Sequence, residues 1–165
     1  MRHKIISYSV VLLSFFAFTN CAGTQDLAPD GSKIPYEVNT IIINTDMTEN
    51  EAFKAIGKHF IQEGYTIKNS SPEFSNVTTE FKEAPAGALQ ASVDVRISAS
   101  VVTENDNTKI LLNGTLRQGM QTSSFDIGES TIKQKGQSGS PMRVAWDEFY
   151  SVAKSFSDNL SFEKR

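Results

Sequence analysis

Between positions 89 and 101 apolar and polar residues alternate, and this run constrains the fold more than any other feature of the chain. A period of two is typical of a β-strand with one buried and one solvated face. The polar group Glu104-Asn105-Asp106-Asn107 that follows predicts a turn, with residues 108–117 pairing back as the second arm of a hairpin. The expected architecture is therefore an antiparallel sheet with one solvent-exposed face.

Two amphipathic helices are predicted, one on each side of this hairpin. The first begins at a capping box, Thr48 with Glu51, and ends at Gly64, because glycine suits the left-handed position after a helix. The second begins with Ser140 as N-cap and Pro141 in the first helical position. The predicted core positions of the two helices are Ala52, Phe53, Ile56 and Phe60, and Ala145, Phe149, Val152, Phe156 and Leu160.

Further strands are predicted around the hairpin and the first helix. Residues 36–44 and the segment from Tyr65 onward favour extended structure, and residues 76–83 alternate loosely. Residues 119–140 are rich in Gly, Ser, Gln and Thr, and are either a long loop or an edge hairpin. The order β-α-β-β-β-β-α predicts an α+β two-layer sandwich, with a mainly antiparallel sheet of four to five strands and two helices on one face.

Cys21 is the only cysteine, and it directly follows an apolar stretch. Arg2 and Lys4 precede residues 5–18, which carry no charge. A membrane-spanning helix needs roughly 20 apolar residues, so we interpret residues 1–20 as a cleavable signal peptide. A lone thiol has no partner for an intramolecular disulfide and no second cysteine with which to share a metal.

The stretch Phe18-Thr19-Asn20-Cys21 resembles the lipobox of bacterial lipoproteins, whose cysteine receives the lipid. The usual box has Leu three residues before the cysteine and a small residue next to it, and this looser form is similar to boxes of the Bacteroidetes group. The resemblance implies lipidation at Cys21 and, because Ala22 rather than Asp follows, a lipid-anchored location at the outer membrane, facing either the periplasm or the medium. The order of elements also resembles small BamC-type lipoprotein modules.

Residues 21–35 consist mainly of small and polar residues, which is typical of a flexible tether, and residues 36–165 are expected to form a single domain. This is enough chain to bury a core without disulfides. Removing the signal leaves 14 basic and 19 acidic residues, a formal net charge of −5. An acidic chain without basic clusters argues against nucleic acid as a partner.

The sequence predicts no catalytic residue, metal site or cofactor. His59 is the only histidine outside the signal, so a rim position on the first helix is favoured over a general base. Glu104, Asp106 and Asn107 offer oxygen ligands, but they lack the glycine and distal glutamate of an EF-hand loop. Residues 136–139 contain two glycines without the Gly-Lys-Ser or Gly-Lys-Thr of a phosphate-binding loop.

Trp146 and Tyr150 lie one turn apart at the shoulder of the second helix, where they either pack at the sheet edge or anchor a partner. We expect these two residues, together with Phe125 and Ile127, to form the region that contacts a partner. The leading hypothesis is a membrane-anchored, non-enzymatic binding or scaffolding module for another envelope component. One alternative is a small-molecule or lipid carrier with an apolar cavity between the sheet and the C-terminal helix. Another is a hydrolase of envelope polymers, with His59 beside a hydroxyl and a carboxylate in one cleft.

Overall fold

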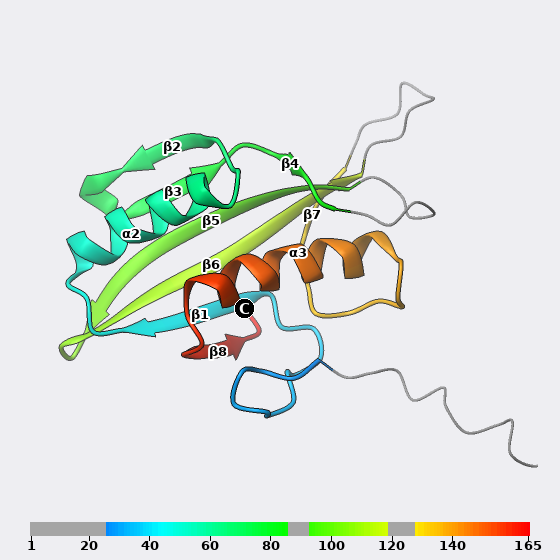
Figure 1. Cartoon of the computed structure of the whole chain (residues 1–165), viewed down its shortest axis with the longest axis horizontal. Coiled ribbons are helices and arrows are strands. Elements are labelled where there is room, and N and C mark those ends of the chain that lie inside the picture. The colour runs from blue at the N-terminus through cyan, green and yellow to red at the C-terminus, as the bar shows by residue number, and fades with distance from the viewer. Residues whose placement is uncertain (1–25, 86–92, 119–127) are drawn as a thin grey trace, which may run out of the picture.

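The computed structural model describes residues 26–85, 93–118 and 128–165. Its frame is a mainly antiparallel open sheet with two helices, so the predicted α+β class is confirmed (Figure 1). The longest strands, β5 (Val93–Glu104) and β6 (Asn107–Gln118), pair along their whole length. The turn between them places Asn105 and Asp106 in the left-handed region, as the tightest hairpin turns require.

The described residues form eight strands, so the prediction of four to five was wrong. The order is β2-β3-β5-β6-β1-β8, with β4 added on β5 and β7 on β6. Several of the strands are short, and two to four residues are too few for alternation to reveal them. The remaining strands are β1 (Thr40–Thr45), β2 (Ile67–Ser71), β3 (Asn76–Thr79), β4 (Lys82–Glu83), β7 (Glu129–Thr131) and β8 (Leu160–Glu163).

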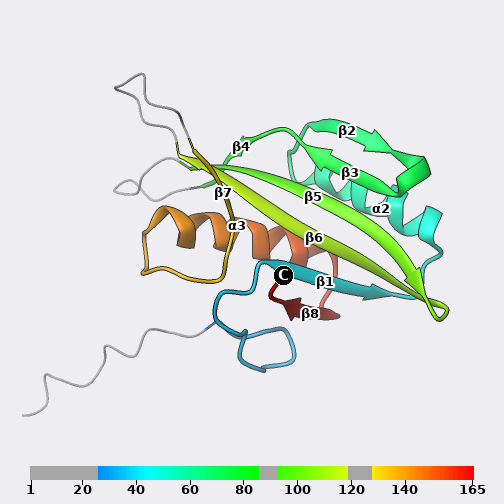
Figure 2. The same cartoon turned by 180° about the vertical axis from the view of Figure 1, so that it is seen from behind.

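Helices α2 (Glu49–Gln62) and α3 (Pro141–Phe156) pack on the same face of the sheet (Figures 1 and 2). The predicted capping box at Thr48 is present. After α2, the Gly64 N–H donates to the Ile61 carbonyl and the Tyr65 N–H to the Phe60 carbonyl, which is the hydrogen-bond pattern expected at a left-handed glycine. Ser140 caps α3 by accepting from the Arg143 N–H, as predicted.

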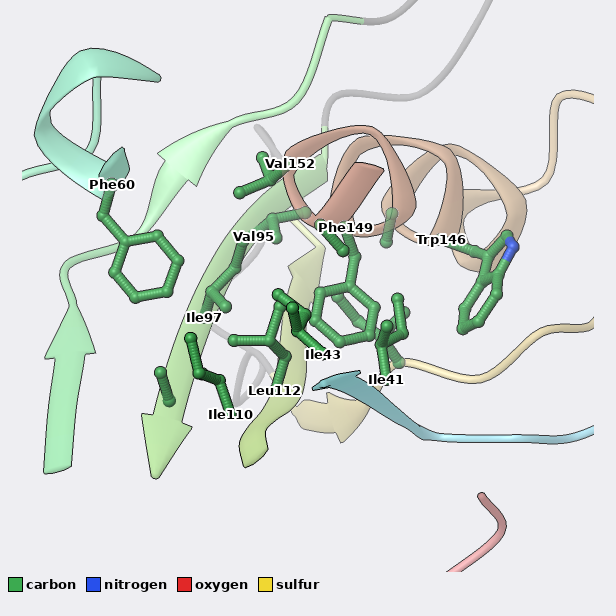
Figure 3. Packing of buried hydrophobic residues seen from close by; sticks show 14 of the residues in the cluster. Ile41, Ile43, Phe60, Val95, Ile97, Ile110, Leu112, Trp146, Phe149 and Val152 are labelled. Carbon is green, nitrogen blue, oxygen red and sulfur yellow. The ribbon is translucent and has the colours of Figure 1, made fainter. Parts of the chain in front are cut away.

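The core lies between the two helices and the inner face of the β5–β6 hairpin (Figure 3). The described part of the alternating run buries its predicted side, because Val93, Val95, Ile97, Ala99 and Val101 are all buried while the residues between them are not. Burial of each large aliphatic or aromatic side chain contributes about 1.5–3 kcal/mol. The largest fully buried side chains include Phe60, Trp146, Phe149, Ile41, Ile43, Ile97, Ile110 and Leu112.

Two element boundaries differ from the prediction. Strand β1 begins at Thr40 rather than at position 36. Helix α3 ends at Phe156, and Leu160, which we expected on its apolar face, lies in β8 opposite Ile43. Leu160 keeps the helical spacing by coincidence, because the backbone of Ser157 is already extended.

The structure also corrects the predicted tether. Residues 26–34, which we expected to be solvated, pack onto the domain, and Ile34 is fully buried. A small turn folds this segment on itself, because the Ala28 N–H donates to the Ser32 carbonyl and the Ile34 N–H to the Asp26 carbonyl. Ala28 and Ile34 are buried, so apolar packing contributes to docking a segment whose composition is otherwise polar.

Residues 119–127 lie outside the described residues. The rest of the glycine-rich segment contains strand β7, which favours the predicted edge hairpin over the predicted loop. Strand β7 pairs antiparallel with the end of β6, as the hairpin alternative requires. Ile132, which follows it, is fully buried against Gly114 of β6.

We expect Gly114→Ala to lower the free energy of unfolding by about 1–3 kcal/mol, because overpacking a filled core is destabilising. A Cβ at position 114 would lie 2.8 Å from Cδ1 and 3.2 Å from Cβ of Ile132. Urea denaturation measures the change. Gly57→Ala is the matched control: no atom lies within 4 Å of the added Cβ, and the change should stabilise α2 by about 0.5–1 kcal/mol. A Gly114→Ala protein as stable as the wild type would contradict this packing.

Candidate functional site

Of the five site residues named from the sequence, three lie outside the residues that the structure describes and one is buried. Cys21, Phe125 and Ile127 lie outside the described residues. Trp146 is fully buried in the core, so the packing interpretation holds for it and the partner-contact interpretation was wrong. Its indole ring meets Phe149 edge-on, with the ring centroids 5.9 Å apart.

Tyr150 remains half-buried at the surface of α3. Its ring stacks on Trp146, with centroids 6.2 Å apart and the planes nearly parallel, and its hydroxyl donates to the Leu27 carbonyl at 3.0 Å. Burial raises the pKa of Tyr150, and the negative charge of Asp26 adds to the effect. The structure thus places Tyr150 under the N-terminal segment.

Tyr150 belongs to a group of contacts that we call the N-terminal clasp, formed by Asp26, Leu27, Gln134, Arg143 and Tyr150. The Arg143 guanidinium lies 2.5 Å from one Asp26 carboxylate oxygen, and the Gln134 amide donates to the other at 3.2 Å. Arg143 also pairs with Asp147 one turn along α3, at 2.9 Å. These contacts fix the first described residues to the start of α3.

No pattern in the sequence predicts the clasp. Asp26 and Arg143 are separated by 117 positions, and neither belongs to a motif. The folding of residues 26–34 onto the domain, with Ile34 fully buried, brings the two residues together.

His59 lies near both a hydroxyl and a carboxylate, as the hydrolase alternative expects. Its Nε2 is 3.2 Å from the Ser155 hydroxyl and 3.9 Å from a carboxylate oxygen of Glu63. The same nitrogen lies 3.0 Å from the Val152 carbonyl. The His59 ring is almost fully buried and meets Phe156 edge-on.

This arrangement differs from that of a catalytic triad. In a triad the two ring nitrogens serve different partners, the nucleophile on one and the carboxylate on the other. Here all the partners surround Nε2, and a carbonyl can only accept, so the tautomer that satisfies Val152 carries a proton on Nε2. That nitrogen then has no lone pair for the Ser155 proton, and the Ser155 hydroxyl instead donates to Glu63 at 2.9 Å. The group links α2 to α3.

A second polar group joins the same two helices to β4. One carboxylate oxygen of Glu148 accepts from the Tyr65 hydroxyl and from the Lys82 ammonium, both at 3.0 Å. Lys82 also donates to the Glu63 carbonyl at the end of α2, where a positive charge is favoured, and lies over the Tyr65 ring. Burial raises the pKa of Tyr65 strongly, with the charge of Glu148 as the next cause.

Glu148 also lines a surface pocket of about 240 Å³ between α3 and Pro85, together with Val144, Asp147 and Ser151. Ligand pockets are typically about 300–1,000 Å³ and enclose most of their ligand. Both carboxylates of this pocket already have cationic partners, Lys82 for Glu148 and Arg143 for Asp147. The pocket therefore offers a ligand little unpaired charge.

The remaining candidates have structural partners. Glu104 pairs with Lys109 at 3.1 Å, and the described ranges contain no group of three or more acidic, histidine or cysteine side chains placed to hold a metal. Gly136 and Gly139 have left-handed backbones in the loop before α3, and Gly136 packs against the Ser140 cap. We therefore interpret this segment as a connecting loop that positions the N-terminus of α3.

No protein-family model matches the chain, and no curated protein matches its sequence. In the described part of the chain, neither helix has the length and apolar character needed to cross a membrane.

Arg143→Met should loosen residues 26–34, because it removes the ion pair with Asp26. A pair of this kind contributes up to about 1 kcal/mol, so amide hydrogen exchange of this segment should accelerate about fivefold while β5 and β6 stay protected. Lys109→Met, which removes a surface pair at the far hairpin, is the control and should leave the segment unchanged. Unaltered exchange at residues 26–34 in Arg143→Met would contradict the clasp.

The raised pKa of Tyr65 predicts a pH dependence of stability. Because the folded protein favours the neutral phenol, the contribution of Tyr65 is complete below the ordinary tyrosine pKa of about 10 and decreases as the pH rises above it. From about pH 9 to 11 the wild type should lose more stability than Tyr65→Phe, measured by urea denaturation at each pH. Tyr36→Phe, at an exposed site, should follow the wild type. Parallel curves for wild type and Tyr65→Phe would refute this role.

Proposed function

We propose that this protein is a bacterial envelope lipoprotein, held at the outer membrane by a lipid on Cys21, whose α+β domain binds or scaffolds another envelope component without catalysis. The charged N-terminus, the apolar stretch and the single cysteine that follows it support the anchor. The clasp supports an anchored role, because it fixes the chain to the domain only a few residues after Cys21.

The observation that carries the proposal is the short distance along the chain between Cys21 and the packed domain. Asp26 is already fixed to α3, so five residue steps separate it from the thiol. Fully extended, they span at most roughly 18 Å. An acylated Cys21 would therefore keep the domain close to the headgroups, with the side that carries Asp26 and Arg143 nearest the anchor.

The polar groups described above support a binding role rather than a catalytic one. The hydrogen bonds that we describe around His59 and Glu148 join the members of each group to one another and tie α2, α3 and β4 together. A catalytic group needs an atom directed at a substrate, and in both groups the hydrogen-bonding atoms that we describe are directed at neighbouring side chains or carbonyls.

No specific observation favours the carrier alternative. The space between α3 and the sheet, where a ligand cavity was expected, is occupied by core side chains that include Phe149, Ile43 and Leu112 (Figure 3). Each of these three side chains is fully buried.

Cys21→Ser tests the anchor. Expressed in a Gram-negative host, the wild type should fractionate with membranes, and its intact mass should include diacylglycerol and an amide-linked acyl chain; Cys21→Ser should lack that mass and leave the membrane fraction. Thr24→Ala, outside the lipobox, is the control and should remain acylated. Density-gradient separation of the two membranes tests the outer-membrane location. A wild-type protein that is soluble and unacylated would overturn the proposal.

A further inference from the structure

An apolar groove of about 250 Å³ lies between α2 and the inner side of β2. On the helix side it is lined by Phe53, Gly57 and Ile61, and on the sheet side by Ile67 and Val77. Gly57 leaves a gap in the helix wall, because no atom lies within 4 Å of the position of its missing Cβ. Ile61 is 62% exposed, so this apolar surface faces water.

Strand β2 forms an edge of the sheet. It pairs with β3 on one side, and no other described strand pairs with it (Figure 1). Edge strands present backbone N–H and C=O groups that can accept an added strand. Successive side chains of an added strand point to opposite faces, so every second one would point toward the side of the sheet on which α2 lies.

The rim of the groove is positively charged in a chain that is acidic as a whole. Lys54 and Lys58 stand one turn apart on α2, line the groove and are exposed. Neither forms an ion pair with any residue that the structure describes. Acidic side chains on an incoming segment would complement them.

A second copy of this chain is a poorer fit to the same edge. Lys68 is an exposed residue of β2 itself, so pairing of two β2 strands would bring lysines of both copies together. Charged residues on edge strands disfavour such self-pairing.

We infer that this groove docks an extended segment of another protein, which adds as a strand on β2, places alternate apolar side chains between α2 and the sheet, and meets Lys54 and Lys58 with acidic residues. The inference rests on the proposed binding function, and it identifies the surface and the chemistry of the partner. It does not require the lipid anchor.

The test is selection from a library of random 12-residue peptides displayed on phage, with the full chain purified in detergent as the target. The enriched peptides should alternate apolar residues and carry Asp or Glu. A synthetic, fluorescein-labelled copy of the most enriched peptide is then titrated with the protein by fluorescence anisotropy. Gly57→Trp, which fills the gap, and Lys54→Glu/Lys58→Glu, which reverses the rim charge, should each weaken binding about tenfold or more.

Two controls keep the result interpretable. Lys33→Glu/Lys154→Glu changes the net charge equally at exposed positions outside the groove and should bind like the wild type. Thermal unfolding by circular dichroism establishes that each variant is folded, and Gly57→Ala, with its smaller side chain, stands in for Gly57→Trp if that variant is not.

The inference is overturned if no peptide is enriched, if the enriched peptides lack acidic residues, or if the groove variants bind them unchanged. Concentration-dependent dimerisation of the chain that Gly57→Trp abolishes would also overturn it, because the occupant would then be a second copy. Loss of acylation affects only the proposed anchor, since the peptide titration is read on purified protein, so the two failures are distinguishable.

Discussion

The rest of the structure depends on the burial of the inner face of the β5–β6 hairpin under α2 and α3. Each strand of the hairpin is 12 residues long, and the two pair in register from end to end, so their alternating side chains form one continuous apolar surface. The helices meet different parts of this surface: α2 also contacts β2 and β3, and α3 also contacts β1. Because the helices are held side by side, their polar residues can satisfy one another.

The features that sequence reasoning predicted correctly are those encoded in local pattern. The alternation around Val95 and Ile97 fixed the strand and its buried side, and Thr48 with Glu51 fixed the start of α2. The placement of Leu160 on the apolar face of the second helix was wrong, because spacing alone cannot show that the helix ends before Ser157. The short strand β8 escaped prediction because its pairing with β1, and not a pattern in its own residues, creates it.

The candidate sites were less predictable than the fold. His59 was recognised as a lone histidine, but its contacts with Ser155 and Val152 come from a helix more than 90 positions away. Trp146 stood at the shoulder of the apolar arc, and only the stacked ring of Tyr150 and the neighbouring Phe149 show that it is enclosed. The groove at α2 also needs the fold, since β2 becomes its second wall only when it lies at the sheet edge.

The clasp has a mechanical consequence. A pulling force on the backbone just ahead of Asp26 meets its ion pair with Arg143, which passes the load to the start of α3 before it reaches β1. The hydrogen bond from Tyr150 to Leu27 and the buried side chain of Ile34 lie next along the path. Tension applied ahead of Asp26 would thus detach a short surface segment before it strains the central hairpin, so the core is mechanically separated from that end of the described chain.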